Sequence, residues 1–311
     1  MLRRVLLAAS ASERVRQLIT TAPLTRDVVK RFVAGDKAAD ALAVTQRLLG
    51  EGLSVTIDYL GEDTVDPEQA TAVASEYVTL LELLAAAGLT VGGRAEVSVK
   101  PTAVGLGLAE HGEKTAAENI GRICAAAQAA GTTVTVDMED HTRVDATLRM
   151  VSELRADFPD LGCVIQSYLR RSPGDCEALA SAGSRVRLCK GAYQAADGFA
   201  FPARSEIDRC YARCMRILLD GDGYPMIATH DPRLVAIATS RVSTIGRDPS
   251  SFEYQMLYGI RTGEQARLAA EGAQVRVYVP YGDDWYGYFM RRLAERPANL
   301  SFFLRALASR R

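Results

Sequence analysis

Eight short apolar segments alternate with eight helical segments along most of the chain, and this alternation limits the fold more than any other feature. Each apolar segment is almost continuously hydrophobic, as parallel strands are when both faces of their sheet are covered. They begin near residues 53, 95, 132, 162, 184, 224, 252 and 273, and helix-spaced apolar positions follow each of them. This order predicts a closed (β/α)8 barrel of the TIM type.

A doubly wound open sheet is the competing α/β topology. It usually has fewer strands and often a glycine-rich first turn, and the chain contains no GxGxxG motif. The 311 residues would suffice for two domains of ordinary size, but one barrel can absorb about 250 residues. We therefore expect a helical segment over residues 1–50 and a barrel domain over 51–311. Helix-spaced apolar positions occur over 26–35 and 37–52, and a closing helix is expected over 298–309 within the barrel domain.

Composition and charge exclude several classes of protein. The hydrophobic fraction of 48% and the charged fraction of 24% are typical of a soluble globular protein, and the net charge of -1 provides no field that would recruit nucleic acid. The six cysteines form no CxxC pair, which predicts reduced, mostly buried thiols in the cytoplasm. Charged residues soon interrupt the short apolar start, so an amphipathic helix is favoured over a secretory signal, and no stretch approaches the ~20 apolar residues of a membrane span.

Polar residues stand at or near the ends of most predicted strands. In a (β/α)8 barrel, the carboxyl ends of the strands surround the active site. Each residue alone has an ordinary explanation, such as a solvated strand end or a helix cap, but together they would face one cleft. The set comprises Lys100, Asp137, Gln166, Arg187, Lys190, Thr229, His230, Asp231, Gln255 and Tyr278.

The residue types in this set indicate the ligand. Arg187, Lys190 and Thr229 carry cationic or hydrogen-bond donor groups, which suit phosphates and an electron-rich ring. Gly191 follows Lys190 directly and would let the backbone approach a pyrophosphate. We expect His230 to bind a ligand and not to act as an acid or base.

A metal site is not expected from this pattern. Asp137, Glu139, Asp140 and His141 contain the right donor atoms, and in a strand Asp137 and Glu139 would share a face. No second cluster of ligating residues completes a coordination shell. The strand-end residues therefore point to an organic ligand.

One predicted helix near residue 288 carries two adjacent arginines among aromatic residues. Four of its residues lie on one face at i, i+3, i+4 and i+7: Tyr288, Arg291, Arg292 and Glu295. An exposed stripe with an ordinary Arg291–Glu295 pair is one interpretation. The flanking Trp285 and Phe289 instead imply a buried helix, where two cations need an anion. A carboxylate held between two guanidiniums would make the substrate a small amino or hydroxy acid.

Seven motifs that carry these residues occur in the order "SVKPT", "VDMED", "RVRLCKGAY", "ATHD", "FEYQMLYGIR", "RVYVPYG" and "YFMRRLAERPAN". Together they resemble the proline dehydrogenases, and the resemblance extends from Leu53 to Leu307. It implies a distorted (β/α)8 barrel that binds FAD and oxidises L-proline to Δ1-pyrroline-5-carboxylate. The chain is too short to include the aldehyde dehydrogenase domain of bifunctional relatives, so it resembles the monofunctional enzymes.

The resemblance also implies roles for individual residues. Arg291 and Arg292 would grip the proline carboxylate, with Lys100 supporting that end and Glu295 holding Arg292. Asp137, Tyr278 and Tyr288 complete the implied substrate pocket. The implied FAD contacts are Asp137, Met138, Gln166, Arg187, Lys190, Gly191, Ala192, Thr229, His230, Gln255 and Leu257. Asp137 and Arg187 are the implied catalytic residues, with Arg187 near flavin N5. Some relatives have a tryptophan two residues after the position of Ala192, where this chain has Gln194.

The resemblance further implies partners and a location. Electrons would pass to a quinone-type acceptor through peripheral contact of a cytoplasmic protein with the inner membrane. A pyrroline-5-carboxylate dehydrogenase would consume the product, and the residues leave the oligomeric state open. Two other functions fit a barrel of this composition. One is a Schiff-base aldolase using Lys100 or Lys190, and the other is a barrel that binds a small acid without turnover.

Overall fold

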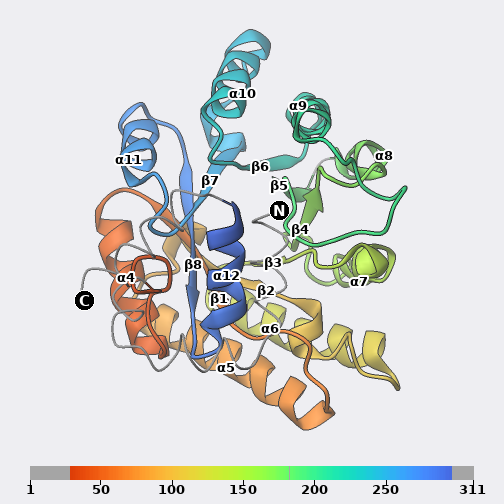
Figure 1. Cartoon of the computed structure of the whole chain (residues 1–311). Coiled ribbons are helices and arrows are strands. Elements are labelled where there is room, and N and C mark those ends of the chain that lie inside the picture. The colour runs from red at the N-terminus through yellow and green to blue at the C-terminus, as the bar shows by residue number, and fades with distance from the viewer. Residues whose placement is uncertain (1–28, 182, 296–311) are drawn as a thin grey trace, which may run out of the picture.

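The structure is a computed structural model that describes residues 29–181 and 183–295, with side chains as far as Met290. Eight parallel strands form a closed barrel in sequence order (Figure 1). Strand β8 pairs with β1, so that Val55 lies opposite Val277 and Ile57 opposite Val279. The strands are β1 Ser54–Tyr59, β2 Ala95–Val99, β3 Val134–Val136, β4 Gly162–Gln166, β5 Arg185–Cys189, β6 Tyr224–Ala228, β7 Glu253–Leu257 and β8 Val275–Tyr281. The barrel prediction is confirmed.

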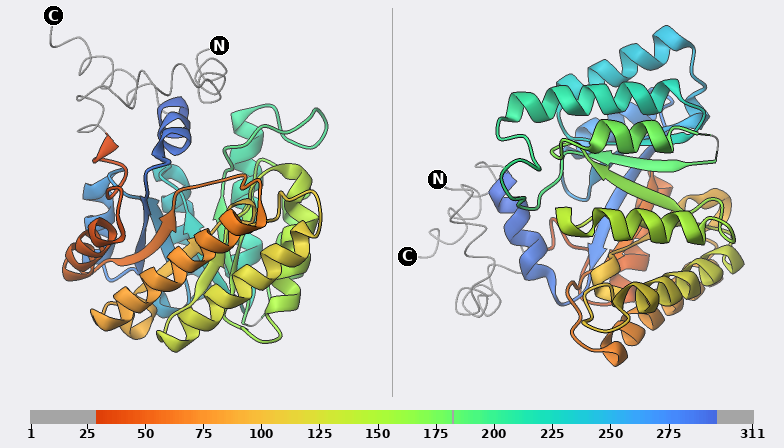
Figure 2. Two further views of the ribbon diagram at one scale, coloured as in Figure 1. Left: turned by 90° about the horizontal axis from the view of Figure 1, so that it is seen from below. Right: turned by 90° about the vertical axis from the view of Figure 1, so that its right-hand side faces the viewer.

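Helices follow the strands, and all but the last described one surround the barrel on the outside (Figures 1 and 2). They are α4 Ala38–Gly50, α5 Pro67–Ala86, α6 Gly112–Ala129, α7 Val144–Leu154, α8 Ser172–Leu179, α9 Arg204–Asp220, α10 Pro232–Ile245, α11 Thr262–Ala270 and α12 Trp285–Glu295. Short 3-10 turns are η1 Val91–Gly93, η2 Pro101–Val104, η3 His141–Arg143 and η4 Pro249–Ser251. Each barrel helix expected from the sequence is present in the described part of the chain.

Local chemistry sets several helix boundaries. Helix α5 begins after Asp66, whose side chain accepts a hydrogen bond from the Gln69 N–H, and has proline at its first position. Helix α10 begins in the same way after Asp231, whose side chain accepts from the Arg233 N–H, and it also has proline at its first position. It stops at Gly246, which adopts a left-handed conformation with φ 64°.

One helix prediction fails in the described region. Residues 30–35, the end of the segment expected to be helical over 26–35, form a turn. The Ala34 N–H donates to the Pro280 carbonyl at 2.9 Å, so this part of the backbone bonds to β8 and leaves the helical path. Residues 1–28 and the closing helix expected over 298–309 lie outside the described residues, and the domain boundary at residue 50 stays a prediction.

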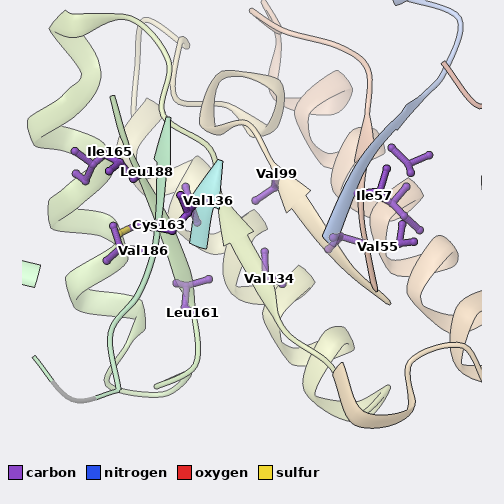
Figure 3. Packing of buried hydrophobic residues seen from close by; sticks show 14 of the residues in the cluster. Val55, Ile57, Val99, Val134, Val136, Leu161, Cys163, Ile165, Val186 and Leu188 are labelled. Atoms are coloured by element: carbon purple, nitrogen blue, oxygen red, sulfur yellow. The ribbon is translucent and has the colours of Figure 1, made fainter. Parts of the chain in front are cut away.

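The outward faces of the strands form the main hydrophobic core. Val55 and Ile57 of β1 and Val186 and Leu188 of β5 are completely or almost completely buried there (Figure 3). Leucines of α5 belong to the same cluster, which explains why the strands are so uniformly apolar on this side. Because side chains alternate along a strand, the residues between these positions face the barrel interior.

The interior near the amino ends of the strands is filled by charged side chains and not by the branched apolar residues usual in such barrels. The Arg185 Nη2 donates to Glu96 Oε2 at 2.7 Å, and the Arg276 Nε donates to Glu253 Oε1 at 2.8 Å. Both carboxylates are at most 1% exposed, so each charge depends on its partner. We call Glu96, Arg185, Glu253 and Arg276 the floor of the barrel.

Helix α12 departs from the outer ring of helices. Its apolar residues pack with Leu60, which follows β1, and with Ile260, which follows β7. It therefore lies at the carboxyl ends of the strands, as Figures 1 and 2 show. Trp285 and Phe289 are 9% and 0% exposed, which confirms the expected burial of this helix. None of the helices in the described ranges is both long and apolar enough to cross a membrane.

Candidate active site

Four of the predicted strand-end residues meet inside the barrel, above its floor. The Arg187 Nη1 donates to Asp137 Oδ1 at 2.7 Å, and the Tyr278 hydroxyl donates to Asp137 Oδ2 at 2.7 Å. The Lys100 Nζ lies 3.8 Å from Asp137 Oδ2 and 3.4 Å from the Tyr278 hydroxyl. Residues from or next to β2, β3, β5 and β8 thus converge on Asp137, as expected from the barrel topology.

Two further residues belong to this cluster and were not anticipated. Asp58 of β1 is fully buried and forms an ion pair with Lys100. Ser98 of β2 donates from Oγ to Asp137 Oδ1 at 2.8 Å and accepts from Arg187 Nη1 at 2.9 Å. A usable signal was present, since Asp58 interrupts an apolar strand and Ser98 precedes Lys100 by two residues, on the same strand face.

The electrostatic environment keeps Lys100 charged. Burial lowers the pKa of Lys100, but the nearby carboxylates of Asp58 and Asp137 outweigh burial and raise this pKa above its ordinary value. Burial raises the pKa of Tyr278 well above its ordinary value, and the charge of Asp137 raises it further. Lys100 is therefore an ammonium group and Tyr278 a neutral hydroxyl that can donate to Asp137.

Arg187 is held on several sides. Its Nε donates to Gln255 Oε1 at 2.6 Å, and its guanidinium lies 5.2 Å from the centre of the Tyr278 ring. Its Nη2 is buried and has no hydrogen-bond partner among the described residues, although Glu96 Oε1 lies 3.9 Å away. This distance is that of an ion pair, so Nη2 interacts with the charge of Glu96 in the floor of the barrel.

The predicted cofactor residues beyond β3 and β4 lie close together. The Gln166 Nε2 donates to the Glu139 carbonyl at 2.8 Å, and Met138 is 5% exposed in a small apolar cluster with Tyr168. Gly191 has φ 90°, and a Cβ there would lie 2.3 Å from the Tyr168 ring. Only glycine fits at this position, which brings the backbone of the segment containing Ala192 close to the end of β4.

The residues after β5 and β6 are tied to neighbours within the chain. The Leu257 N–H donates to His230 Nε2 at 2.9 Å, so this ring nitrogen is an acceptor and its role here is not that of a free base. The Thr229 Oγ1 accepts from the Asp231 N–H at 3.1 Å. The Lys190 Nζ lies 2.6 Å from Asp208 Oδ1 and 3.2 Å from Asp231 Oδ2, so its charge is already met by carboxylates, and a phosphate contact stays a prediction.

Helix α12 brings the predicted substrate-binding segment to this end of the barrel. Tyr288 is 5% exposed in the apolar cluster that holds the helix. Positions 291, 292 and 295 continue the helix, as expected, while the side chains of Arg291, Arg292 and Glu295 lie outside the described part of the structure. The proposed carboxylate clamp therefore stays a prediction.

Glu139 joins the loop after β3 to the segment after Lys100. Its carboxyl oxygens accept from the Thr102 N–H at 2.9 Å and from the Thr102 hydroxyl at 2.6 Å. Burial raises the pKa of Glu139 from 4.5 to about 7, and the bonds from Thr102 offset part of this increase. Because the folded-state pKa exceeds the unfolded value, the stabilisation from this group is complete below pH 4.5 and is lost as the pH rises through about 7.

The Glu139→Gln variant should lack this pH dependence. Between about pH 5 and pH 8, the unfolding free energy of the wild type should fall by about 2–3 kcal/mol more than that of the variant. Urea unfolding at both pH values measures the difference. Equal pH dependence in the two proteins would show that Glu139 titrates normally in the folded state.

Comparison with known proteins places this chain in a family. The family model described as proline dehydrogenase matches residues 41–305. The proline dehydrogenase of Deinococcus radiodurans is 40% identical over 283 residues, which cover 90% of each chain. Proline dehydrogenase 1 of Bacillus subtilis is 38% identical over 307 residues, which cover 99% of each chain.

A solved structure shares the fold. Proline utilization A (PutA) from Bdellovibrio bacteriovorus, inactivated by N-propargylglycine, matches with a TM-score of 0.79 and 25% identity. The match covers 86% of this chain and 32% of that longer polypeptide. With the barrel and the matches over nearly the whole chain, the protein belongs to the proline dehydrogenase family of flavin-type oxidoreductases.

Proposed function

We propose that the protein oxidises L-proline to Δ1-pyrroline-5-carboxylate and transfers the hydride to bound FAD. The observation that carries this proposal is the hydrogen-bonded cluster of Asp137, Arg187 and Tyr278 at the carboxyl ends of the barrel strands. It combines a fixed cation, a carboxylate and a hydroxyl where barrel enzymes bind their substrates. Membership of the proline dehydrogenase family supplies the reaction.

The residues present fit a flavin dinucleotide. Arg187 is a buried cation fixed by Asp137 and Gln255, and such a cation suits the electron-rich atoms of a flavin ring. Gly191, with its left-handed backbone and lack of room for a side chain, suits close approach of the backbone to a pyrophosphate. Bound FAD would supply the hydride acceptor. Met138, Gln166, Lys190, Ala192, Thr229, His230, Gln255 and Leu257 are the other residues proposed to hold it.

The residues of this chain would contribute orientation and charge. Arg187 is fixed by Asp137 and Gln255, so its positive charge can stabilise electron density gained by a bound ring without further rearrangement. Asp137 accepts from both Arg187 and Tyr278 and thereby fixes the positions of the two groups. Hydride transfer needs the reacting carbon to be held close to its acceptor, and an amine that arrives neutral needs no strong base.

A second group of residues would bind the substrate. We propose that Arg291 and Arg292 bind the proline carboxylate and that Glu295 holds Arg292. Lys100, kept charged by Asp58, would support the same carboxylate. Tyr278 and Tyr288 would enclose the apolar ring of the substrate.

Electrons and product must then leave the enzyme. We propose a quinone-type acceptor reached by peripheral contact of a cytoplasmic protein with the inner membrane, and a pyrroline-5-carboxylate dehydrogenase as the consumer of the product.

The two lysines weighed for aldolase chemistry do not suit a Schiff base. Such a lysine needs a lowered pKa, whereas the pKa of Lys100 is raised and Lys190 lies between two aspartates.

The test of the proposed function incubates the protein with L-proline and an artificial electron acceptor. We expect acceptor reduction and a product that reacts with o-aminobenzaldehyde. Borohydride labelling of a lysine with a keto acid, without proline-dependent reduction, would overturn the proposal.

A further inference from the structure

Glu253 lies in the floor of the barrel but is connected to the proposed active site. It is the first residue of β7, is 1% exposed, and Gln255, on the same face of the strand, is 3% exposed. The Gln255 Nε2 donates to Glu253 Oε1 at 2.5 Å. The Gln255 Oε1 in turn accepts from Arg187 Nε at 2.6 Å. A continuous chain of two short hydrogen bonds thus joins Glu253 to Arg187.

The orientation of the Gln255 amide is set by the groups on either side of it. Arg187 has donors only, so Gln255 must present its oxygen to it, and Glu253 offers acceptors only, so Gln255 must present its amide nitrogen there. If Gln255 turned over, two donors would face each other at Arg187 and two acceptors would face each other at Glu253. Gln255 can therefore hold Arg187 only while an acceptor is fixed on its other side.

Glu253 is itself held firmly in place. The Arg276 Nε donates to its two oxygens at 2.8 and 3.1 Å, and the Tyr224 hydroxyl donates to Oε2 at 3.2 Å. Arg276 is anchored further by hydrogen bonds to the carbonyls of Val55, Arg94 and Gly93. The floor thus provides a rigid acceptor beneath Gln255.

We propose that Glu253 is a positioning residue for the reaction, which fixes the Gln255 amide and through it the orientation of the Arg187 guanidinium. The proposal rests on the proposed function for the role of Arg187, but the hydrogen-bond chain itself can be tested without proline. Glu253 lies in the floor, below the proposed site, and its influence on Arg187 would pass through one side chain.

Two variants remove the Glu253 acceptor to different degrees. Glu253→Gln keeps an oxygen that can face Gln255 but introduces an amide that can also turn over. The double variant Glu253→Leu with Arg276→Met removes the acceptor together with its buried partner, because leaving Arg276 unpaired would destabilise the fold. The control is Tyr224→Phe, which removes a hydrogen bond to the opposite oxygen of Glu253 and leaves Gln255 untouched.

The first readout is hydrogen exchange at the Arg187 Hε, followed by NMR on the purified protein labelled with 15N-arginine. The signal is assigned by its absence from Arg187→Ala. Exchange should be about threefold faster in Glu253→Gln and at least about tenfold faster in the double variant, as expected when a buried hydrogen bond is weakened or lost. Tyr224→Phe should match the wild type.

The second readout is kinetic. kcat for proline should be lower in Glu253→Gln than in the wild type, and lowest in the double variant. KM should stay within about twofold, because Arg187 is proposed to act on the flavin ring and not on the substrate. In an Arg187→Ala background, Glu253→Gln should cause no further loss of kcat.

Equal Arg187 Hε exchange in Glu253→Gln and Tyr224→Phe would overturn the proposal, and this comparison remains decisive even if the double variant does not fold. Additive losses of kcat in the Arg187→Ala background would overturn it as well. If the exchange rates follow the expected order but proline is not oxidised, the positioning role stands and the proposed function fails.

Discussion

Replacement of Arg187 by alanine is expected to lower kcat for proline oxidation by about 100- to 1,000-fold, the cost of removing one preorganised electrostatic contact to a reacting group. The guanidinium is buried and bound to Asp137 and Gln255. Its interaction with a bound flavin should strengthen as the ring gains electrons, so kcat should change and KM should not. Steady-state kinetics with an artificial acceptor measures both.

Arg155→Ala is a suitable control for this experiment. Arg155 is also partly buried, but it donates to the Leu161 and Arg185 carbonyls near the amino ends of β4 and β5, away from the site. Its loss should lower stability and leave kcat unchanged. A rise in KM with unchanged kcat in Arg187→Ala would show that Arg187 contacts the substrate and not the ring.

Replacement of Arg291 or Arg292 by alanine is expected to weaken proline binding by about 10- to 100-fold. Each arginine would form a charge-assisted hydrogen bond with the proline carboxylate, worth about 1.5–3 kcal/mol. Lysine should not restore binding fully, because a point charge cannot make a two-pronged contact. The double variant should lose less than the sum of the single losses, since both arginines bind one carboxylate.

Pyrrolidine, which lacks the carboxylate, provides the control. Its weak binding should hardly change when either arginine is replaced. If Arg291→Ala weakened the binding of pyrrolidine and proline equally, the arginines would support the structure of α12 and would not hold the substrate.

The barrel could be predicted from sequence because its strands repeat one strong signal. A strand such as β8 has Val275, Val277 and Val279 on its outward face, and these pack against helices whatever lies inside the barrel. Residues 30–35 could not be assigned correctly, because their conformation depends on a bond from Ala34 to Pro280, far away in the sequence.

The sequence predicted which strand-end residues would come together, but it did not predict which side chains would bond to one another. Strand-end position alone indicated that Lys100, Asp137, Arg187 and Tyr278 would meet, and they do. Asp58 was not predicted, although it lies one residue before the end of β1, because the apolar segment continues beyond it through Tyr59 and Leu60. The fold brings Asp208 and Asp231 to Lys190, and a single sequence contains no sign of these ion pairs; the phosphate contact of Lys190 stays a prediction.

The ion pairs in the floor of the barrel are likewise not visible in the sequence. Glu96 and Arg185 lie 89 positions apart, and each looks like an unexplained charge in a strand. Their pairing follows only from closure of the barrel, which brings alternate residues of distant strands together. The connection from Glu253 to Arg187 therefore became visible only in the structure.

The most direct test of the account is an anaerobic titration of the purified protein with L-proline, followed by its visible absorption spectrum. The account predicts a yellow protein with non-covalently bound FAD, whose absorption is bleached by L-proline as the hydride reaches the flavin. A colourless protein that gains no activity when FAD is added, or a flavin spectrum that L-proline leaves unchanged, would contradict it.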